Sequence, residues 1–383
     1  MTSPLRDLRP VRKHPLREIG ALLRSRQFWA ILFVLTGLSQ LIAASRLADG
    51  LRGAGVDSAI LFGEAPATLK DIVVVEIDDE TYRTHFSKKV PLDPEKLSAL
   101  VNSLQNAGAA VIGFDMEPER ALSVQGDANV VWAAGLRRDA HNRTSIEEFS
   151  GAVFGVPRVL RGRDGIVRRY ALNTVVDGRA YLTLTAQIAR QACAAPHPKH
   201  WEGCGKTFNR GERALLSDET TSLIRFAPDP KAITHVPASL VMDVEASGGW
   251  KTSEFFRGKI VLIGGTWMES RDEHITPLGA QYGVYVLAQS VATALAGGGL
   301  QEPAGYVLFL VKLLAGIFVG MLAAVLSSRW SVFLHLIIVP VAAVGFAAYA
   351  VTANYWVDFV PVLMSGFIHQ WFHDVSSHGH ETS

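Results

Sequence analysis

The chain has 383 residues, of which 49% are hydrophobic, and its formal net charge is +1. A mean hydropathy of +0.20 is high for a soluble globular protein, and several membrane spans beside an ordinary domain would account for it. A net charge this close to zero argues against nucleic acid or strongly acidic substrates as partners, because no global field would attract them.

The N-terminal segment predicts a basic cytoplasmic arm followed by a first membrane span. Residues 1–27 contain seven arginine or lysine residues and two acidic residues, and residues 28–46 are mostly apolar. Such a run is long enough to cross a bilayer, and its basic flank should stay in the cytoplasm. A cleaved signal peptide is the alternative. It is less favoured because the basic region is long and no clean small-x-small cleavage site ends the apolar run.

An α/β domain is predicted over residues 47–302, beginning with a strand, a helix and a second strand. The β-branched run 71–77 is typical of a buried strand, and residues 110–114 form another. Between them, a helix is expected to start with Asp93 as its N-cap and Pro94 in its first turn, and to end before Gly108. This order predicts a βαβ unit with parallel strands.

The rest of the domain alternates short strands and helices. Strands are expected at 151–156, 221–226 and 259–263, helices at 182–193, 239–245 and 282–295, and a hairpin turn at Asp177-Gly178. Residues 130–136 fit either a helix or a strand. The pattern predicts a three-layer α/β domain with a mixed sheet.

The strand at 259–263 is the expected centre of this domain. Its unbroken apolar run suits a strand covered on both faces, and Gly264 and Gly265 let the backbone turn at its end. A charged loop over 268–279 follows, and the helix at 282–295 then leads into a long apolar segment. One stretch of chain therefore links the sheet, the charged loop and the membrane.

Three further membrane spans are expected at 303–327, 330–352 and 355–373, followed by a cytoplasmic tail at 374–383. With four spans, the α/β domain lies in the periplasm and both termini lie in the cytoplasm, which places Arg329 on the side that the charge bias favours. Gly316 and Gly320 form a Gly-x3-Gly face, which indicates a possible homodimer. Because four membrane spans are expected, the lipid bilayer is the first expected partner.

Several ordered motifs resemble the CHASE2 family of extracytoplasmic bacterial sensory domains. They are found at 71–79, 108–115, 164–168, 258–264, Asp272, 276–279, Gly283, Val284 and Ala288. The resemblance covers roughly residues 71–300 and implies a periplasmic sensor. In the family the last spans usually lead into a fused output module, whereas here they lead into a short tail. The resemblance therefore implies signalling in trans to a separate membrane or cytoplasmic partner.

Four aspartates follow predicted buried strands, where parallel α/β sheets bind their ligands. Clustered carboxylates repel one another, so a cation or a cationic ligand could stabilise them. The alternative is that each aspartate caps a turn or helix through backbone N–H groups. Lys259 is either a partner for these aspartates or an exposed strand end. The candidate ligand-binding residues are Asp78, Asp79, Asp115, Lys259, Thr266 and Asp272.

Cys193 and Cys204 are the only cysteines, and a periplasmic location favours a disulfide between them. The bond would close a loop of about twelve residues and contribute roughly 3 kcal/mol in the chain-entropy model. A zinc site with His197 and His200 is the alternative, although the spacing matches no common zinc module.

Three functions remain in consideration, in order of preference. The first is an inner-membrane sensor that signals in trans, and the second is a non-catalytic subunit of an envelope complex. The third is a metal-dependent hydrolase that uses the aspartates. No nucleophile elbow, Walker loop or zinc-protease motif is present, so we expect neither an enzyme nor a cofactor.

Overall fold

The computed structural model describes two compact units, Gly63–Leu300 and a second unit formed by Met1–Phe62 with Gln301–Ser383. The described residues are 15–24, 26, 29–30, 33–34, 37, 53, 55–61, 63–116, 129–138, 144–147, 152–195, 201–208, 221–246, 254–300, 305–325, 337, 341, 345 and 349.

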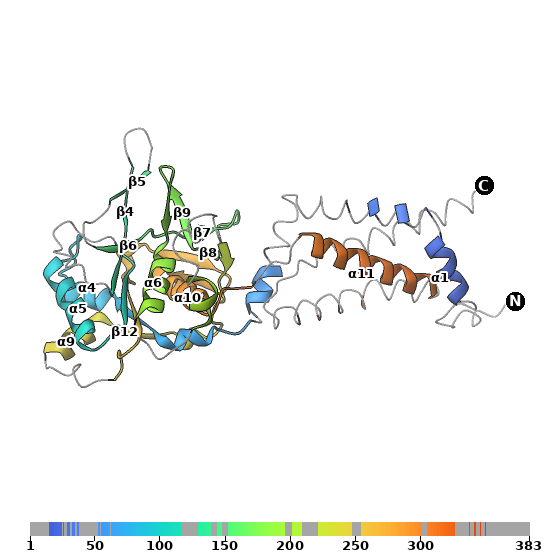
Figure 1. The fold of residues 1–383 in the computed structure, drawn as a ribbon. Coiled ribbons are helices and arrows are strands. Elements are labelled where there is room, and N and C mark those ends of the chain that lie inside the picture. Colours follow the sequence, from blue (N-terminus) through green and yellow to red (C-terminus); the bar gives the residue numbers. More distant parts are fainter. Residues whose placement is uncertain are drawn as a thin grey trace. The chain divides into compact units, whose positions relative to one another are not determined.

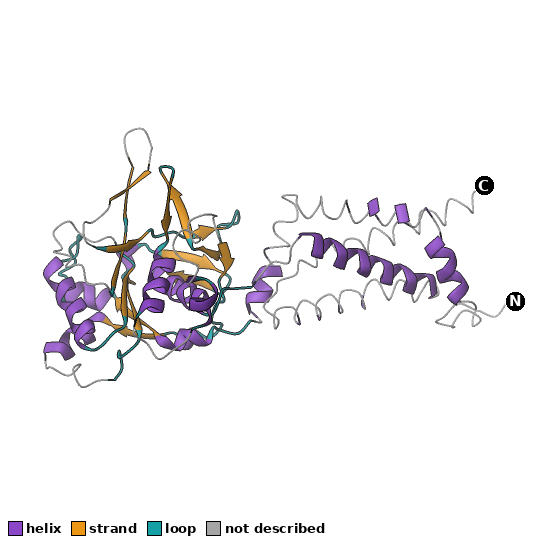
Figure 2. Cartoon of the chain, in the orientation of Figure 1, coloured by secondary structure: helices purple, strands orange, loops and turns teal. Residues whose placement is uncertain are grey.

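A parallel sheet forms the middle of the Gly63–Leu300 unit (Figure 2). In spatial order its strands are β12 (Thr234–Pro237), β1 (Ile72–Ile77), β13 (Ile260–Gly265), β2 (Val111–Phe114), β3 (Val130–Ala133) and β6 (Val153–Gly155). Each neighbouring pair is parallel. This corrects the expected mixed sheet, because the antiparallel strands pair in separate small sheets.

Helices cover both faces of the sheet, so the predicted three layers are confirmed (Figure 1). One face carries α4 (Asp79–Thr84), α5 (Pro94–Asn106) and α9 (Ala238–Ala246), and the other carries α6 (Leu184–Ala194) and α10 (Gly283–Leu295). Successive side chains of a strand point to opposite faces of the sheet. On β1, the side chains of Val73, Val75 and Ile77 pack against the face that carries α4, α5 and α9. Gly264 points to the opposite face, where Val284 of α10 approaches so closely that a Cβ atom would lie 2.4 Å from its Cβ.

The predicted βαβ unit is confirmed. Asp93 caps α5 by accepting the N–H of Glu95 at 3.0 Å, and Gly108 follows the helix with a φ of +79°. Strands β1 and β2 are both parallel to β13, which lies between them. Residues far along the chain therefore complete the centre of this unit.

Antiparallel strands form the small sheets beside the central one. The pairs or groups are β7 (Leu160–Arg161) with β8 (Val167–Ala171) and β11 (Thr221–Leu223), β9 (Asn173–Val176) with β10 (Arg179–Leu182), β4 (Gly135–Arg138) with β5 (Thr144–Glu147), and β14 (Glu273–Thr276) with β15 (Gly279–Tyr282). Asp177 and Gly178 form the predicted hairpin turn, both with positive φ. The expected loop at 268–279 contains the short helix η5 (Met268–Ser270) and most of the β14–β15 hairpin.

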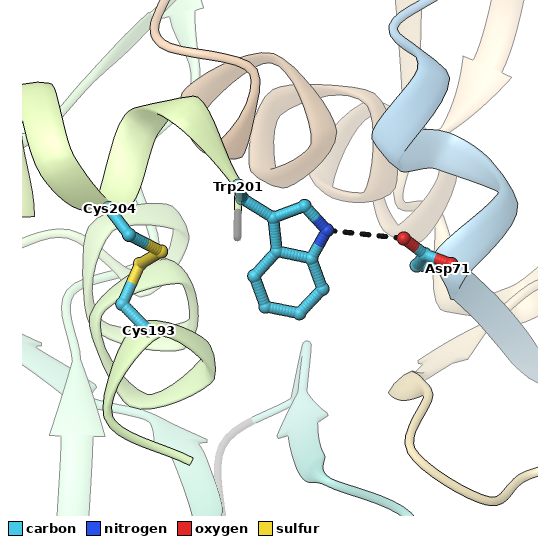
Figure 3. The surroundings of a disulfide bond; sticks show 4 residues. All are labelled: Asp71, Cys193, Trp201 and Cys204. Atoms are coloured by element: carbon cyan, nitrogen blue, oxygen red, sulfur yellow. Dashed lines mark hydrogen bonds between the residues drawn. A yellow bond between two sulfur atoms is a disulfide. The ribbon is translucent and has the colours of Figure 1, made fainter. Parts of the chain in front are cut away.

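The predicted disulfide between Cys193 and Cys204 is present, with the two Cα atoms 5.4 Å apart (Figure 3). It joins the end of α6 to α7 (Glu202–Lys206). The zinc alternative needs two thiolates, which the disulfide removes. His197 and His200 lie outside the described residues.

Helices α1 (Pro15–Arg24) and α11 (Gly305–Val325) belong to the second unit. They fall within the expected basic arm and the expected span at 303–327, respectively. In the described part of the chain, no helix is both long enough and apolar enough to cross a membrane. Most residues of the expected spans at 28–46, 330–352 and 355–373 lie outside that part. All four spans therefore stay predictions.

Candidate functional site

The carboxyl ends of β1, β13 and β2 bring polar side chains to one edge of the central sheet. Glu76 of β1 stands opposite Gly264 of β13. Thr266 comes directly after the last residue of β13, and its N–H donates to the carbonyl oxygen of Ile77 at 3.0 Å. Asp115 follows β2, and its N–H donates to the carbonyl oxygen of Ile263 at 2.8 Å. We call this edge, with the polar residues that contact it, the carboxyl edge.

Asp78 and Asp79 serve the local backbone at this edge. Asp78 is the N-cap of α4 and accepts the N–H of Thr81 at 2.7 Å. Asp79 accepts the N–H of Met268 at 3.0 Å, which ties α4 to the segment after β13. For these two residues the capping alternative describes the observed contacts.

Glu76 is the centre of the first polar group. The hydroxyl of Tyr285 donates a hydrogen bond to Oε1, and the hydroxyl of Thr266 donates to Oε2 at 3.3 Å. Nε2 of His235 lies 3.9 Å from Oε1. Burial, followed by the hydrogen bond to Glu76, raises the pKa of Tyr285, so its hydroxyl stays protonated and acts as the donor.

A second polar group joins Asp272, His274 and Arg161. Nε2 of His274 lies 3.1 Å from Oδ1 of Asp272, and Nη2 of Arg161 lies 3.2 Å from Nδ1 of His274. A guanidinium group can only donate hydrogen bonds, so a hydrogen bond between these two atoms uses Nδ1 as the acceptor. In this arrangement Nε2 of His274 faces the carboxylate of Asp272 and Nδ1 faces the guanidinium of Arg161.

Asp115 belongs to this second group through its charge. Burial of the carboxyl and then the negative charge of Asp272 raise the pKa of Asp115, His274 lowers it, and the net result is a pKa of about 7. The charge of Asp272 thus acts on Asp115, and the shared ligand site that the sequence suggested for these residues stays a prediction.

Both polar groups contact the first turn of α10. The N–H of Gly283 donates to the carbonyl oxygen of Asp272 at 2.8 Å. A Cβ atom on Gly283 would lie 2.1 Å from Oδ2 of Asp272, so only glycine leaves room for the carboxylate. Two residues later Tyr285 reaches Glu76. The carboxylate of Asp272 thus lies at the positive end of the α10 dipole.

Lys259 does not take part in this site. It precedes β13, at the amino end of the sheet, where Nζ donates to the carbonyl oxygen of Lys70 at 2.7 Å and lies 3.7 Å from Oδ1 of Asp71. The other carboxylate oxygen of Asp71 accepts the indole N–H of Trp201 at 3.1 Å (Figure 3). The partner of Lys259 is therefore a different aspartate from those that the sequence suggested.

Sequence reasoning missed several residues of the site. Glu76 is the one charged residue within the apolar run of β1, which was the available signal for it. His274 lies in the charged loop that the sequence did single out. Nothing local marked Tyr285 or Arg161, because their roles depend on contacts between distant segments.

The described residues do not support a metal centre at this edge. Among them, no three His, Cys, Asp or Glu side chains are grouped so that they could hold a metal ion.

A parallel sheet covered on both faces, with polar side chains at its carboxyl edge, defines an α/β domain suited to binding or sensing at that edge. The family model of the CHASE2 domain matches residues 29–326, so the chain belongs to the CHASE2 family. This is a family of extracytoplasmic sensory domains. No curated protein and no solved structure matches the chain.

Proposed function

We propose that this protein is a sensor anchored in the bacterial inner membrane, which detects a signal at the carboxyl edge of a periplasmic domain. It passes a conformational change to a separate signalling partner and has no catalytic activity of its own. The observation that carries this proposal is that both polar groups of the edge hold the first turn of α10.

Helix α10 is well placed along the chain to carry a change away from the edge. It packs against β13 and α6, and most of its side chains are buried, so it should move as a rigid element. Gly297 and Gly298 follow the end of the helix, and their φ angles are +93° and +111°. The next described helix along the chain is α11, which covers most of the second expected span.

The contacts at the edge also fit a role in holding parts of the domain together. Glu76 already accepts hydrogen bonds from Tyr285 and Thr266, and Asp272 already lies at hydrogen-bonding distance from His274. These carboxylates are well placed to hold two parts of the domain together until a signal alters the contacts.

The proposal is tested by crosslinking the full chain in its native membrane and identifying the proteins joined to it. A kinase, cyclase or other regulator on the cytoplasmic side supports sensing in trans. Recovery of envelope components alone would contradict it and favour the structural-subunit alternative. A second inner-membrane protein, expressed at the same level, controls for nonspecific crosslinking.

A further inference from the structure

We propose that the disulfide between Cys193 and Cys204 is a redox site, which a dithiol opens and re-forms, such as the reactive pair of a thiol–disulfide oxidoreductase. In its closed form the bond holds α7 against the segments through which the chain enters and leaves the Gly63–Leu300 unit. Reduction loosens both contacts. The inference goes beyond the proposed function, because it concerns the amino end of the sheet and not the carboxyl edge.

Helix α7 packs closely on the last turn of α10. A Cβ atom on Gly203 of α7 would lie 2.1 Å from the carbonyl oxygen of Ala294, so the backbones of the two helices are in direct contact. Beyond the end of α10, a Cβ atom on Gly297 would lie 3.6 Å from Cγ of Glu202. The unit ends three residues later, at Leu300. Helix α7 therefore lies against the segment through which the chain leaves the unit.

Trp201 connects α7 to the segment through which the chain enters the unit. Its side chain is buried, and the indole N–H donates to Oδ2 of Asp71 at 3.1 Å (Figure 3). Asp71 is the last residue of the short helix η1 (Ala67–Asp71) and directly precedes β1. Within η1, the hydroxyl of Thr68 donates to the carbonyl oxygen of Ala292 at 2.7 Å. The entering segment, α7 and the end of α10 therefore form one junction.

The disulfide attaches this junction to α6. The N–H of Cys204 donates to the carbonyl oxygen of Trp201 at 3.1 Å, so the bonded cysteine and the indole belong to the same turn. Cys193 lies near the end of α6, which packs on β2, β3 and β6 of the central sheet. Helix α7 has five residues, and a helix of this length is not stable by itself. The bond to α6 therefore restricts the positions that Trp201 can take.

Loss of the indole contact changes the surroundings of a buried acid. Asp71 is 3% exposed, and its Oδ1 lies 3.7 Å from Nζ of Lys259. A buried carboxylate that loses a hydrogen-bond donor is less well stabilised, so the backbone nearby adjusts or water enters. Either change alters η1 and the start of β1. Opening of the disulfide thus acts on the entering segment through Trp201.

The chemistry at the bond is thiol–disulfide exchange. Both cysteines are partly exposed, and Gly205 and Lys206 beside Cys204 are exposed, so a reductant can approach this side of the domain. A thiolate of the dithiol attacks one sulfur, breaks the S–S bond and forms a mixed disulfide, and the second thiol then displaces the attached cysteine. Two electrons pass to the protein. The two protons that the dithiol loses balance those that the cysteine thiols gain.

The first measurement asks whether the bond opens while the domain stays folded. The full chain in lipid nanodiscs is treated with dithiothreitol, and the free thiols are labelled with N-ethylmaleimide and counted by mass. The proposal predicts that both cysteines are labelled without denaturant, and that α5 keeps its protection against amide exchange. Labelling that requires denaturant would overturn it, because the bond would then open only on unfolding.

Amide hydrogen exchange of the oxidised and the reduced protein then shows what the bond holds. Reduction should speed the exchange of α7 by up to about a hundredfold, the ratio that corresponds to the chain-entropy contribution of this loop. Exchange of η1 should rise about tenfold, as for the loss of one hydrogen bond to a charged group, and the last turn of α10 should change in the same direction. Helix α5, on the opposite face of the sheet, should be unchanged. Unchanged exchange in η1 and α10, with both thiols free, would overturn the proposal.

Three variants make the result specific. The double variant Cys193→Ser with Cys204→Ser should exchange as the reduced protein does, with or without dithiothreitol. Trp201→Phe keeps the disulfide but lacks the N–H, so η1 should exchange fast in the oxidised form and gain little from reduction. Trp267→Phe is the matched control, because its indole N–H has no partner among the described residues, and η1 should respond there as in the wild type. A full response of η1 in Trp201→Phe would contradict the route through the indole.

The outcome separates this inference from the function proposed above. A redox response without a crosslinked signalling partner would leave the redox site standing and remove signalling in trans. A signalling partner without a redox response would do the reverse.

Discussion

The hydroxyl of Tyr285, in the first turn of α10, donates a hydrogen bond to the carboxylate of Glu76 in the central strand β1. This contact ties the helix that leads out of the domain to the middle of its sheet. Thr266, after β13, donates to the other oxygen of the same carboxylate. Three elements that are distant in sequence therefore meet at one charged group.

Replacement of Tyr285 by Phe should lower the free energy of unfolding by about 1.5–3 kcal/mol, the usual range for a hydrogen bond to a charged group. Chemical denaturation of the Gly63–Leu300 unit within the full chain would measure the change. Tyr82→Phe is the matched control, because that ring stacks on Trp267 and its hydroxyl has no hydrogen bond with the described residues. Equal losses in the two variants would contradict the role given to Glu76.

Replacement of Gly283 by Ala should displace the start of α10, because the new Cβ would lie 2.1 Å from Oδ2 of Asp272. We expect a loss of about 1–3 kcal/mol, as for overpacking elsewhere. Gly205→Ala in α7 is the control; its Cβ meets nothing within 4 Å, so stability should be unchanged or rise by up to about 1 kcal/mol.

The effect of Gly283→Ala should also depend on Asp272. Combining it with Asp272→Ala removes the carboxylate that the new methyl group meets, so the double variant should lose less than the sum of the two single variants. Additive losses, measured in a double-mutant cycle by chemical denaturation, would show that the two residues do not constrain each other.

The raised pKa of Asp115 predicts how the free energy of unfolding of the domain depends on pH. Its pKa is raised from 3.8 to about 7, so between these values the folded protein holds a proton that the unfolded chain has released. The stabilisation is fully present below pH 3.8 and is lost as the pH rises to about 7, at up to roughly 1.4 kcal/mol per pH unit. Urea denaturation from pH 4.5 to 8 should show this decline superimposed on the other titrations.

Asp115→Asn is the variant that isolates this contribution. It should reduce the fall in the free energy of unfolding with pH by up to roughly 1.4 kcal/mol per pH unit. The contributions of the other titrating groups should stay unchanged. A stability profile parallel to that of the wild type across the whole range would mean that Asp115 ionises normally in the folded state.

Reduction of the disulfide should lower the free energy of unfolding by about 3 kcal/mol in the chain-entropy model for a loop of this size. The bond holds α7 close to the end of α10, where a Cβ on Gly203 would lie 2.1 Å from the carbonyl oxygen of Ala294. Denaturation with and without reductant, and of Cys193→Ser with Cys204→Ser, would measure the effect. Unchanged stability under reduction would show that other contacts hold α7 in place.

Much of the fold could be predicted from local sequence signals. The apolar run before Gly264 predicted β13, Asp93 and Pro94 predicted the start of α5, and Asp177-Gly178 predicted the β9–β10 turn. These features depend on neighbouring residues, so the sequence displays them directly. The family resemblance was also correct, since the CHASE2 model matches most of the chain.

Features that depend on distant pairing could not be predicted in the same way. The periodicity of the sequence does not show that β13 lies between β1 and β2. Nor does it show that the antiparallel strands pair outside the central sheet, so that every pair in the central sheet is parallel. The same limit applies to the site. The sequence placed Asp115 and Asp272 at strand ends, but it could not show that Arg161 and His274 complete their surroundings.

The central claim is that the carboxyl edge controls, through α10, the interaction with a partner. The most direct test compares crosslinking in native membranes between the wild type, Tyr285→Phe and Tyr82→Phe at matched expression. The account predicts that the yield of the signalling partner changes in Tyr285→Phe and is unchanged in Tyr82→Phe. The same yield in all three proteins, with the Tyr285–Glu76 contact shown to be lost, would contradict it.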